Sequence, residues 1–243
     1  MSISKDLRSL SSNLRLSGLI PTLPERIRYA EQNRLTFEEF LELIFSEEWE
    51  RRRNRLLNIK LKKAGVDSNL EGYDWDTTTQ YDRGLVRRLM GLDFMERRNS
   101  ILLFGPTGVG KTFLARHLSF MALKSGYSVV FTRAEKMFRH LCSSLLDGTR
   151  ERTLRYYLSP DLLVIDDFAT RAMTREEAND FYEIILERHE RRSNIVTSAR
   201  APDEWQPLFP DPILGNSALD RLAHTSYQIL MEGESIRKQR RPR

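Results

Sequence analysis

The chain contains 243 residues, and 39 lysines and arginines against 34 aspartates and glutamates give it a formal net charge of +5. Hydrophobic residues make up 40% of the chain and aromatic residues 9%, which is enough for a packed core and excludes wholesale disorder. No apolar run approaches the roughly 20 residues of a membrane-spanning helix, and the N-terminus lacks the continuous apolar segment of a signal peptide. We therefore expect a cytoplasmic protein with no membrane partner.

The cysteine and histidine content excludes two kinds of stabilisation. Cys142 is the single cysteine, so no internal disulfide can form, and the four histidines are too scattered to supply a structural zinc site. We expect Cys142 to be a small buried side chain.

The first seventy residues have the pattern of short amphipathic helices. Apolar residues recur at intervals of three and four, Pro21 and Pro24 separate the segments, and no strand pattern is evident. We expect a group of apolar residues near the middle of this region to be core rather than a groove for a partner, namely Leu35, Phe37, Phe40 and Leu41. Trp49 and Trp75 fit either packing or stacking on a base or sugar.

A longer helix is predicted within this region. Thr36 and Glu39 match a capping box, which indicates a helix that begins near Phe37. The helical pattern runs past Trp49 into a basic segment, and Gly65 supplies a stop.

A turn-rich, acidic stretch over residues 66–82 separates two regions with different sequence patterns. We place a helical N-terminal domain at residues 1–70, a linker at 71–84, a second domain at 85–235 and a basic tail at 236–243. In the second domain, short Val/Ile/Leu runs alternate with helical patterns, which is typical of an α/β fold with a parallel sheet covered on both faces. The runs lie at 100–105, 128–132, 161–166, 194–198 and 226–230, and the helices at 111–124, 135–146 and 175–192.

The strongest motif is a phosphate-binding loop, GPTGVGKT, between a predicted strand and a predicted helix. Its glycines let successive N–H groups turn inward and form an anion nest at the positive end of the helix. Lys111 can then reach the β and γ phosphates of ATP, and the Thr112 hydroxyl can bind Mg²⁺. The expected nucleotide-binding residues here are Gly105, Pro106, Thr107, Gly108, Val109, Gly110, Lys111, Thr112 and Phe113.

Two carboxylates, Asp166 and Asp167, end the apolar run at 162–165. The carboxyl end of a buried strand lies beside the phosphate loop in open α/β sheets, where ligands bind. We expect Asp166 to hold Mg²⁺ through water and Asp167 to orient the attacking water. An aspartate reaches one methylene less far than the glutamate often found in that role, and an Asp-Asp pair can also simply cap the next helix.

Two further elements complete the predicted site. The run at 194–198 ends in Thr197 and Ser198, either of which can sense the γ phosphate, although hydroxyls at a strand end also serve ordinary turns. Arg221 lies on a short helical stretch before the last strand, where an arginine can complete a neighbouring subunit's nucleotide site. The alternative for Arg221 is a surface salt bridge.

The motifs GPTGVGKT, LLVIDDF, VTSARAPDEW, ALDRLAH and GESIRKQR, in this order and spacing, resemble those of the IstB-like AAA+ ATPases, helper proteins of bacterial insertion sequences. The related DnaC-type helicase loaders are similar too, and the resemblance covers nearly the whole chain. It implies an AAA+ P-loop NTPase domain with three layers, preceded by a small all-helical domain. It also implies an Mg²⁺-dependent ATPase that forms homo-oligomers on duplex DNA, dependent on nucleotide and DNA, and that recruits a partner transposase.

The resemblance carries over to particular residues. The trans-acting arginine corresponds to Arg221, and Arg237 is a candidate for a second nucleotide-sensing arginine. Related ATPases often carry a polar amide after the Thr-Ser pair, where this chain has Ala199, so the sensor stays open between Thr197 and Ser198.

The basic part of the long predicted helix fits DNA binding, since affinity for DNA comes largely from neutralising phosphates. No base-reading motif is visible, so we expect binding that tolerates any sequence. The same run can also be a solvated face paired with nearby glutamates. The candidate DNA-binding residues are Arg51, Arg52, Arg53, Arg55, Lys60, Lys62 and Lys63.

The leading functional prediction is an ATP-dependent, DNA-binding regulator of transposition. A helicase loader whose N-terminal region grips a replicative helicase is the nearest alternative. A stand-alone nucleotide-phosphorylating enzyme uses the same loop, but it needs an arginine-rich lid over the acceptor, and Arg221 falls outside the predicted pocket.

Overall fold

The structure, a computed structural model, describes residues 3–66 and 79–236 of the chain. It contains two compact units, which divide between residues 59 and 60, and each is described by itself. The basic tail from residue 237 on and most of the expected linker, including Trp75, lie outside the described residues.

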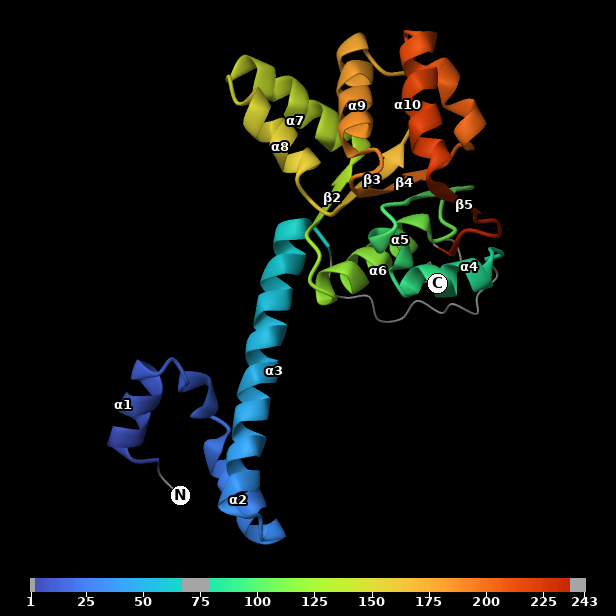
Figure 1. Cartoon of the computed structure of the whole chain (residues 1–243). Coiled ribbons are helices and arrows are strands. Elements are labelled where there is room, and N and C mark those ends of the chain that lie inside the picture. Colours follow the sequence, from blue (N-terminus) through green and yellow to red (C-terminus); the bar gives the residue numbers. More distant parts are fainter. Residues whose placement is uncertain (1–2, 67–78, 237–243) are drawn as a thin grey trace, which may run out of the picture. The chain divides into compact units, whose positions relative to one another are not determined.

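Among the described residues of the N-terminal unit, the regular elements are all helices, as the apolar spacing predicts (Figure 1). Its elements are α1 (Lys5–Asn13), the 3-10 turn η1 (Ser17–Leu19), α2 (Leu23–Asn33) and the first part of α3 (Phe37–Ala64). The capping box is confirmed, because the Glu39 backbone N–H donates to Thr36 Oγ1 at 3.2 Å and the Thr36 N–H donates to Glu39 Oε2 at 2.7 Å. These bonds satisfy two donors that the start of a helix leaves free.

The core of this unit is smaller than the sequence suggests. Leu23 and Ile44 are buried, and Arg26 of α2 binds Glu47 of α3 at 2.7 Å. The expectation that Phe37 and Leu41 are core is wrong, because their side chains are 92% and 50% exposed. Their spacing is helical, but no described element of this unit covers that side of α3.

The last turns of α3 belong to the second unit, whereas we expected the N-terminal domain to extend to residue 70. Leu61, Ala64 and Val66 are buried. Gly65 ends the helix with a φ of +75°, a conformation that glycine adopts without steric cost. A Cβ at this position would lie 3.0 Å from the Phe131 carbonyl oxygen, so the chain passes close to the sheet here.

A five-stranded, wholly parallel sheet organises the second unit, in the order β2-β3-β4-β1-β5. The strands are β1 (Ser100–Phe104), β2 (Val129–Arg133), β3 (Leu162–Phe168), β4 (Ser193–Ser198) and β5 (Ser226–Leu230). The central strands are buried on both faces, which explains their continuous apolar runs.

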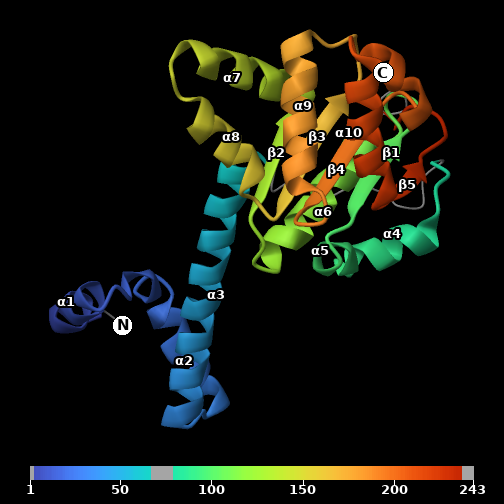
Figure 2. The same cartoon turned by 45° about the horizontal axis from the view of Figure 1, so that its top comes forward.

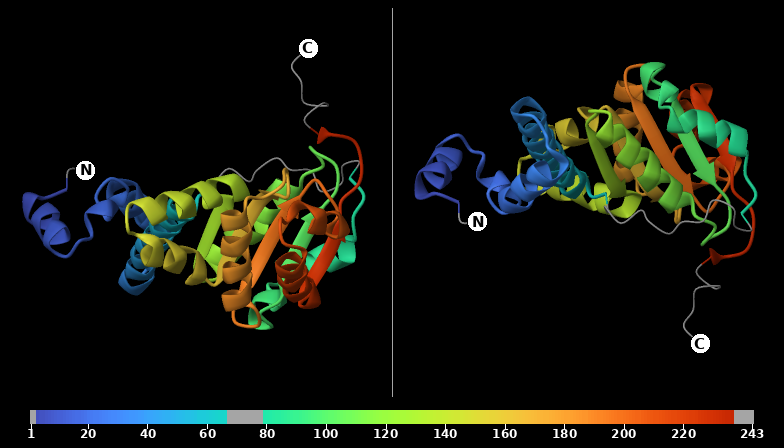
Figure 3. Two further views of the ribbon diagram at one scale, coloured as in Figure 1. Left: turned by 90° about the horizontal axis from the view of Figure 1, so that it is seen from above. Right: turned by 90° about the horizontal axis from the view of Figure 1, so that it is seen from below.

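Helices cover both faces of this sheet and give three layers (Figures 1 and 2). The helix α6 (Lys111–Lys124) packs on one face, with α4 (Arg83–Met90) and α5 (Asp93–Glu96) nearby. On the other face lie α7 (Ala134–Leu146), α8 (Arg150–Leu158), α9 (Arg175–Arg188) and α10 (Pro212–His224), together with the short turns η2 (Pro202–Glu204) and η3 (Gln206–Leu208). Figure 3 shows the two sets of helices from above and below. The predicted α/β fold with a preceding helical domain is confirmed.

Several details differ from the prediction. Helices α4, α5 and α8 were not expected, and α9 ends at Arg188 rather than at residue 192. Cys142 is exposed, and its expected burial is wrong, because the buried stripe of α7 is centred on Met137, Phe138 and Leu141 and position 142 lies at the margin of that stripe, about 100° round the helix from Leu141.

The end of α9 is held by a buried cation. Arg188 is fully buried and donates to the backbone oxygens of Tyr157, Leu158, Pro160 and Ser193 and to the side chain of Asn194, at 2.6–3.2 Å. Burial lowers its pKa to about 9, still above neutral pH, so the guanidinium stays charged. This one side chain joins α8, the start of β3 and the start of β4.

None of the helices in the described parts of the chain combines the length and apolar content that crossing a lipid bilayer requires.

Candidate nucleotide-binding site

The phosphate loop lies between β1 and α6, as predicted, and its backbone takes the conformation that the motif requires. Gly105, Gly108 and Gly110 have φ values of +134°, +92° and +106°, a region that favours glycine. The loop therefore delivers its N–H groups to the N-terminal end of α6, where the helix dipole favours an anion. Pro106 and Thr107 are exposed at its crest, Val109 is buried beneath it, and the Phe113 ring stacks on His117 one turn into the helix.

Lys111 is folded back onto the loop. Its side chain is buried, and Nζ donates to the carbonyl oxygens of Gly105 at 2.6 Å and Pro106 at 2.7 Å. These acceptors keep the ammonium in the loop, next to the position where phosphates would bind. A nucleotide would replace neutral carbonyls with charged phosphate oxygens as its partners, and such charge-assisted bonds are stronger.

Asp166 lies at the centre of the site. Its side chain is buried, and Oδ1 accepts hydrogen bonds from Thr112 Oγ1 at 2.9 Å and from Thr197 Oγ1 at 2.6 Å. Burial raises the pKa of this carboxyl group, and the two hydroxyl donors oppose that rise. The phosphate loop, β3 and β4 thus meet at one oxygen atom.

A bulge in β3 separates the two carboxylates. The pairing with β4 shifts between Ile165 and Phe168, so that two residues, Asp166 and Asp167, occupy the space of one. Asp167 has a φ of +56°, its N–H donates to Thr197 Oγ1 at 3.0 Å, and its side chain is exposed, with Oδ2 4.0 Å from Nε of Arg133. The bulge therefore points Asp166 into the protein and Asp167 into solvent at the edge of the site.

The two hydroxyls that end β4 have different partners. Thr197 contacts Asp166 and Asp167, whereas the Ser198 hydroxyl donates to the Phe168 carbonyl at 2.8 Å and accepts from the Arg200 N–H at 3.1 Å. Ser198 thus closes the turn after the strand, and only Thr197 is connected to the carboxylates.

The segments that begin and end this domain in the sequence both contact the phosphate loop, and the sequence did not predict these contacts. The Thr79 hydroxyl donates to the Val109 carbonyl at 3.2 Å, and the Ile236 N–H donates to the Gly108 carbonyl at 3.1 Å. A Cβ at Gly108 would lie 2.2 Å from the Ser235 hydroxyl. No motif marks Thr79, which falls in the expected linker.

These two segments are also joined to each other. Gln80 and Glu232 form an antiparallel bridge, with N–H to oxygen distances of 2.8 and 2.9 Å. The next residue inward, Met231, donates to the Phe104 carbonyl at the end of β1 at 2.8 Å. Arg237, which follows Ile236, lies outside the described residues.

Arg221 is held by its own helix. Its guanidinium donates to the Ser217 backbone oxygen at 2.8 Å and to the Ser217 hydroxyl, and it lies over the Tyr182 ring at 5.9 Å. The surface salt bridge that we considered as the alternative role of Arg221 is not formed with any residue that the structure describes. The half-buried Arg221 is therefore positioned on α10 but contacts none of the carboxylates or the phosphate loop.

The seven basic residues of α3 fall into two groups. Arg51 and Arg52 bind Glu48 at 2.7 Å each, Arg52 also donates to the Arg15 backbone oxygen, and the Arg51 guanidinium packs against Gly18. Both arginines thus help attach α1 and η1 to α3. The other basic residues of this segment are exposed on α3, namely Arg53, Arg55, Lys60, Lys62 and Lys63.

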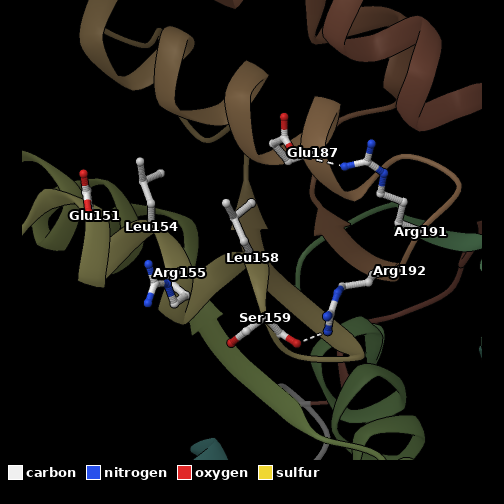
Figure 4. Close-up of a pocket in the computed structure, with 8 residues that line it drawn as sticks. All are labelled: Glu151, Leu154, Arg155, Leu158, Ser159, Glu187, Arg191 and Arg192. Atoms are coloured by element: carbon white, nitrogen blue, oxygen red, sulfur yellow. Dashed lines mark hydrogen bonds and ion pairs between the residues drawn. The ribbon is translucent and has the colours of Figure 1, made fainter.

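A wide pocket lies away from the nucleotide loop, between the ends of α8 and α9 (Figure 4). Its volume is about 500 Å³, with Leu154 and Leu158 at its centre and Arg155, Arg191 and Arg192 around it. These residues come just before β3 and β4 begin, at the opposite edge of the sheet from the phosphate loop. Ligands of open α/β sheets bind at the carboxyl ends of the strands, so the size of this pocket does not make it the nucleotide site.

The sheet order, the loop after β1 and the carboxylates near the end of β3 define a P-loop NTPase domain of the AAA+ type. The chain matches the family model of the IstB-like ATP binding proteins over residues 9–243, and it belongs to that family.

Relatives extend over nearly the whole chain. An ATP-binding protein in an insertion sequence of Mycobacterium tuberculosis is 35% identical over 97% of this chain and 95% of its own length. The insertion sequence IS21 ATP-binding protein of Pseudomonas aeruginosa is 33% identical over 96% of this chain and 88% of its own length.

Solved structures share the fold. The DnaC helicase loader superposes with a TM-score of 0.58 and 20% identity over 68% of this chain and 97% of its own. The replication initiator DnaA, bound to AMPPCP and single-stranded DNA, gives a TM-score of 0.56 and 22% identity over 68% of this chain and 50% of its own.

Proposed function

We propose that this protein is an Mg²⁺-dependent ATPase that assembles on duplex DNA and there recruits and stimulates the transposase of an insertion sequence. Its membership of an ATP-binding family and the insertion-sequence origin of its relatives support the setting. The observation that carries the enzymatic part is the Asp166 carboxylate oxygen, which Thr112 and Thr197 both contact.

The oxygen atoms of the site fit Mg²⁺. Thr112 and Asp166 place a hydroxyl and a carboxylate oxygen side by side beside the phosphate loop, and hard oxygen ligands suit this ion. Among the described residues no cluster of three or more acidic, histidine or cysteine side chains occurs, in keeping with an ion that takes its remaining ligands from phosphates and water. When bound, Mg²⁺ neutralises charge on the phosphate oxygens during transfer.

Residues of the protein itself bind the phosphates, sense the γ phosphate and orient the attacking water. Lys111 and the loop N–H groups bind the β and γ phosphates, and Thr197 senses the γ phosphate from the end of β4. The exposed Asp167 orients a water for attack on the γ phosphorus, and the bond from that phosphorus to the bridging oxygen of ADP breaks. Thr197 holds the Asp167 backbone, so the sensor and the water-orienting residue are physically linked.

We propose that Arg221 acts on the nucleotide of a neighbouring subunit. Its charge has no carboxylate partner among the described residues, and it contacts nothing in its own nucleotide site. An arginine supplied in trans stabilises charge on the transferring phosphoryl group.

Mixed subunits test the role of Arg221. Arg221→Ala and Lys111→Ala should each be nearly inactive alone, but an equimolar mixture should regain turnover at interfaces that combine an intact loop with an intact arginine. If the mixture hydrolyses ATP no faster than the two variants measured separately, Arg221 does not act in trans.

DNA binding is proposed for the exposed basic residues of α3. Arg53, Arg55 and Lys62 carry no ion pair with another described residue, so their charges are available to phosphates. Neutralising phosphates releases counterions, and affinity then falls steeply with salt. Several subunits side by side multiply this effect.

Sedimentation of the full chain with Mg²⁺ and ATP, with and without duplex DNA, tests the proposed assembly. We expect a large assembly when both are present, and we expect this assembly to capture the transposase. A chain that stays monomeric on duplex DNA whatever the nucleotide contradicts the proposal, and a discrete complex formed only with a replicative helicase indicates a loader instead.

A further inference from the structure

Another pocket lies at the edge of the sheet opposite to the phosphate loop, and the nucleotide site does not use it. Its volume is about 350 Å³, and it is enclosed by the last turn of α3, the end of α6, the start of β2 and the end of α8. The two units divide before residue 60, so this pocket lies wholly within the second unit. The length of α6 separates it from the phosphate loop by about 20 Å, since the 14 residues of the helix rise by about 1.5 Å each.

The charged residues that line this pocket are both cations. Lys60 and Lys63 lie one turn apart on α3, and neither forms an ion pair with a residue that the structure describes. Among the described residues, no acidic side chain lines the pocket. Side chains three residues apart lie on the same side of a helix, so both ammonium groups can reach one anion. The lining therefore fits a group with about two negative charges, such as a phosphate monoester.

Three helices end at this pocket, and the C-terminal end of a helix favours cations over anions. Here the final carbonyl groups are already paired. Backbone N–H groups that follow α3 and α6 donate to the last turn at 3.0–3.3 Å, and the buried Arg188 guanidinium binds three carbonyl groups at the end of α8. The nearby Asp161 carboxylate accepts from the N–H and the hydroxyl of Ser128, at 2.8 and 2.6 Å. The two lysines are thus the charges that a ligand in the pocket meets.

The rest of the wall is apolar and aromatic. Tyr127 and Tyr156 line it, together with the aliphatic side chains of Leu123, Val129 and Val130. Tyr156 is 43% exposed, and it packs at 77° to the Tyr157 ring, with the two centroids 5.0 Å apart. A partly exposed aromatic ring that its neighbours hold in place provides a surface on which a nucleic-acid base stacks.

We propose that this pocket binds one nucleotide, with its phosphate between Lys60 and Lys63 and its base against Tyr156. Pockets for small ligands measure about 300–1,000 Å³, so a volume of about 350 Å³ admits a single nucleotide, either free or at the 5′ end of a DNA strand. Among the described residues, no Arg, Asn or Gln side chain lines the pocket to read base edges, so we expect similar affinity for different bases. This inference goes beyond the proposed function, which uses ATP at the phosphate loop and duplex DNA.

Thymidine 5′-monophosphate is a suitable probe, because it lacks the β and γ phosphates that the phosphate loop binds. Isothermal titration of the full chain in about 100 mM salt should give a Kd on the order of 100 µM. Deoxycytidine 5′-monophosphate should bind within about threefold of this value, and inorganic phosphate at least about tenfold more weakly, because it has no base to stack. Absence of nucleotide binding, or inorganic phosphate that binds as tightly as the nucleotide, overturns the proposal.

Lysine variants with a matched control locate the bound probe. Lys60→Gln/Lys63→Gln should weaken binding of thymidine monophosphate about tenfold or more, because the phosphate loses both charge-assisted partners. Lys62→Gln removes an exposed charge from the same turn but outside the lining, and it should change the affinity less than about twofold. Lys111→Ala should bind the probe as wild type does. Equal effects of the two glutamine variants, or loss of binding in Lys111→Ala, contradict the assignment.

Substitutions of Tyr156 test the stacking of the base. Tyr156→Phe keeps the ring and should leave the affinity within about twofold, whereas Tyr156→Ala should weaken it about tenfold, as expected when one stacking surface is lost. Thermal unfolding followed by circular dichroism shows whether each variant remains folded. Equal affinities of the phenylalanine and alanine variants contradict stacking on this ring.

The length of the ligand distinguishes the two sources of the nucleotide. A 5′-phosphorylated thymidine trinucleotide that binds at least as tightly as the monophosphate identifies the end of a DNA strand as the ligand. A trinucleotide that binds at least about tenfold more weakly identifies a free nucleotide, because the enclosed pocket then rejects the longer chain. Both results support the pocket. ATP hydrolysis and assembly on duplex DNA do not enter these titrations, so failure of this inference leaves the proposed function standing.

Discussion

The two hydroxyls at the end of β4 allow a matched experiment on the γ-phosphate sensor. Thr197 and Ser198 are both 1% exposed, and each makes two hydrogen bonds. Thr197→Val keeps the shape of the side chain and removes a donor to the Asp166 carboxylate and an acceptor for the Asp167 N–H. Ser198→Ala removes a donor to the Phe168 carbonyl and an acceptor for the Arg200 N–H.

The expected losses of stability are similar. A hydrogen bond to a charged group contributes about 1.5–3 kcal/mol and a neutral one about 1 kcal/mol, so Thr197→Val should cost about 3 kcal/mol and Ser198→Ala about 2 kcal/mol. At about 2–4 °C per kcal/mol for a domain of this size, the midpoint temperatures should fall by about 6–12 °C and 4–8 °C.

The effects on catalysis should differ sharply. If Thr197 senses the γ phosphate and holds Asp167 in place, losing about 2 kcal/mol of transition-state stabilisation lowers kcat about 30-fold, whereas Ser198→Ala should change kcat by less than about twofold. Steady-state hydrolysis with Mg²⁺ and saturating DNA, well below both midpoint temperatures, measures this. Normal turnover in Thr197→Val, or an equal loss in both variants, refutes the assignment.

Three further substitutions probe other contacts. Lys111→Ala should weaken ATP binding about 100-fold or more in equilibrium titration, since the loop then lacks its ammonium group; unchanged affinity would show that phosphates bind elsewhere. Asp167→Asn should bind ATP normally but lower kcat about tenfold or more, and near-normal hydrolysis means that another residue orients the water. The Arg51 and Arg52 guanidinium groups lower the pKa of Glu48 to about 2, below its ordinary 4.5, so its charge stabilises the fold above pH 4.5 and loses this effect as the pH falls towards 2. Glu48→Gln should therefore lower the free energy of unfolding by about 2 kcal/mol at pH 7, as measured in urea; this value is reduced to allow for the half-exposed arginines. The difference in unfolding free energy between wild type and variant should become smaller below pH 4.5, and a difference that does not depend on pH would contradict the ion pairs.

The sequence predicts the nucleotide-binding domain well because local sequence patterns mark its strands and helices. The phosphate loop fixes where β1 ends and α6 begins, and α6 spans the predicted residues 111–124. Continuous apolar runs mark β3 and β4 because both faces of these strands are buried. The roles of the individual site residues stay predictions.

Other features depend on contacts that no local pattern reveals. The bulge that separates Asp166 from Asp167 arises from the pairing of β3 with β4, and the five acceptors of Arg188 come from two separate stretches of chain, 157–160 and 193–194. Thr79 reaches the phosphate loop across 30 residues of sequence. Periodicity alone also placed Phe37 and Leu41 in a core, because a repeat shows which face of a helix is apolar but not whether anything covers it.

The bridge between Gln80 and Glu232 has a consequence for the behaviour of the whole domain. It fastens the stretch that enters the domain to the stretch that leaves it, and each is separately hydrogen-bonded to the loop that would cradle the phosphates. A displacement of either stretch, caused by a neighbouring subunit or by a molecule bound elsewhere on the chain, would therefore move the phosphate loop. By linkage, ATP bound to this loop would restrict the motion of both stretches together.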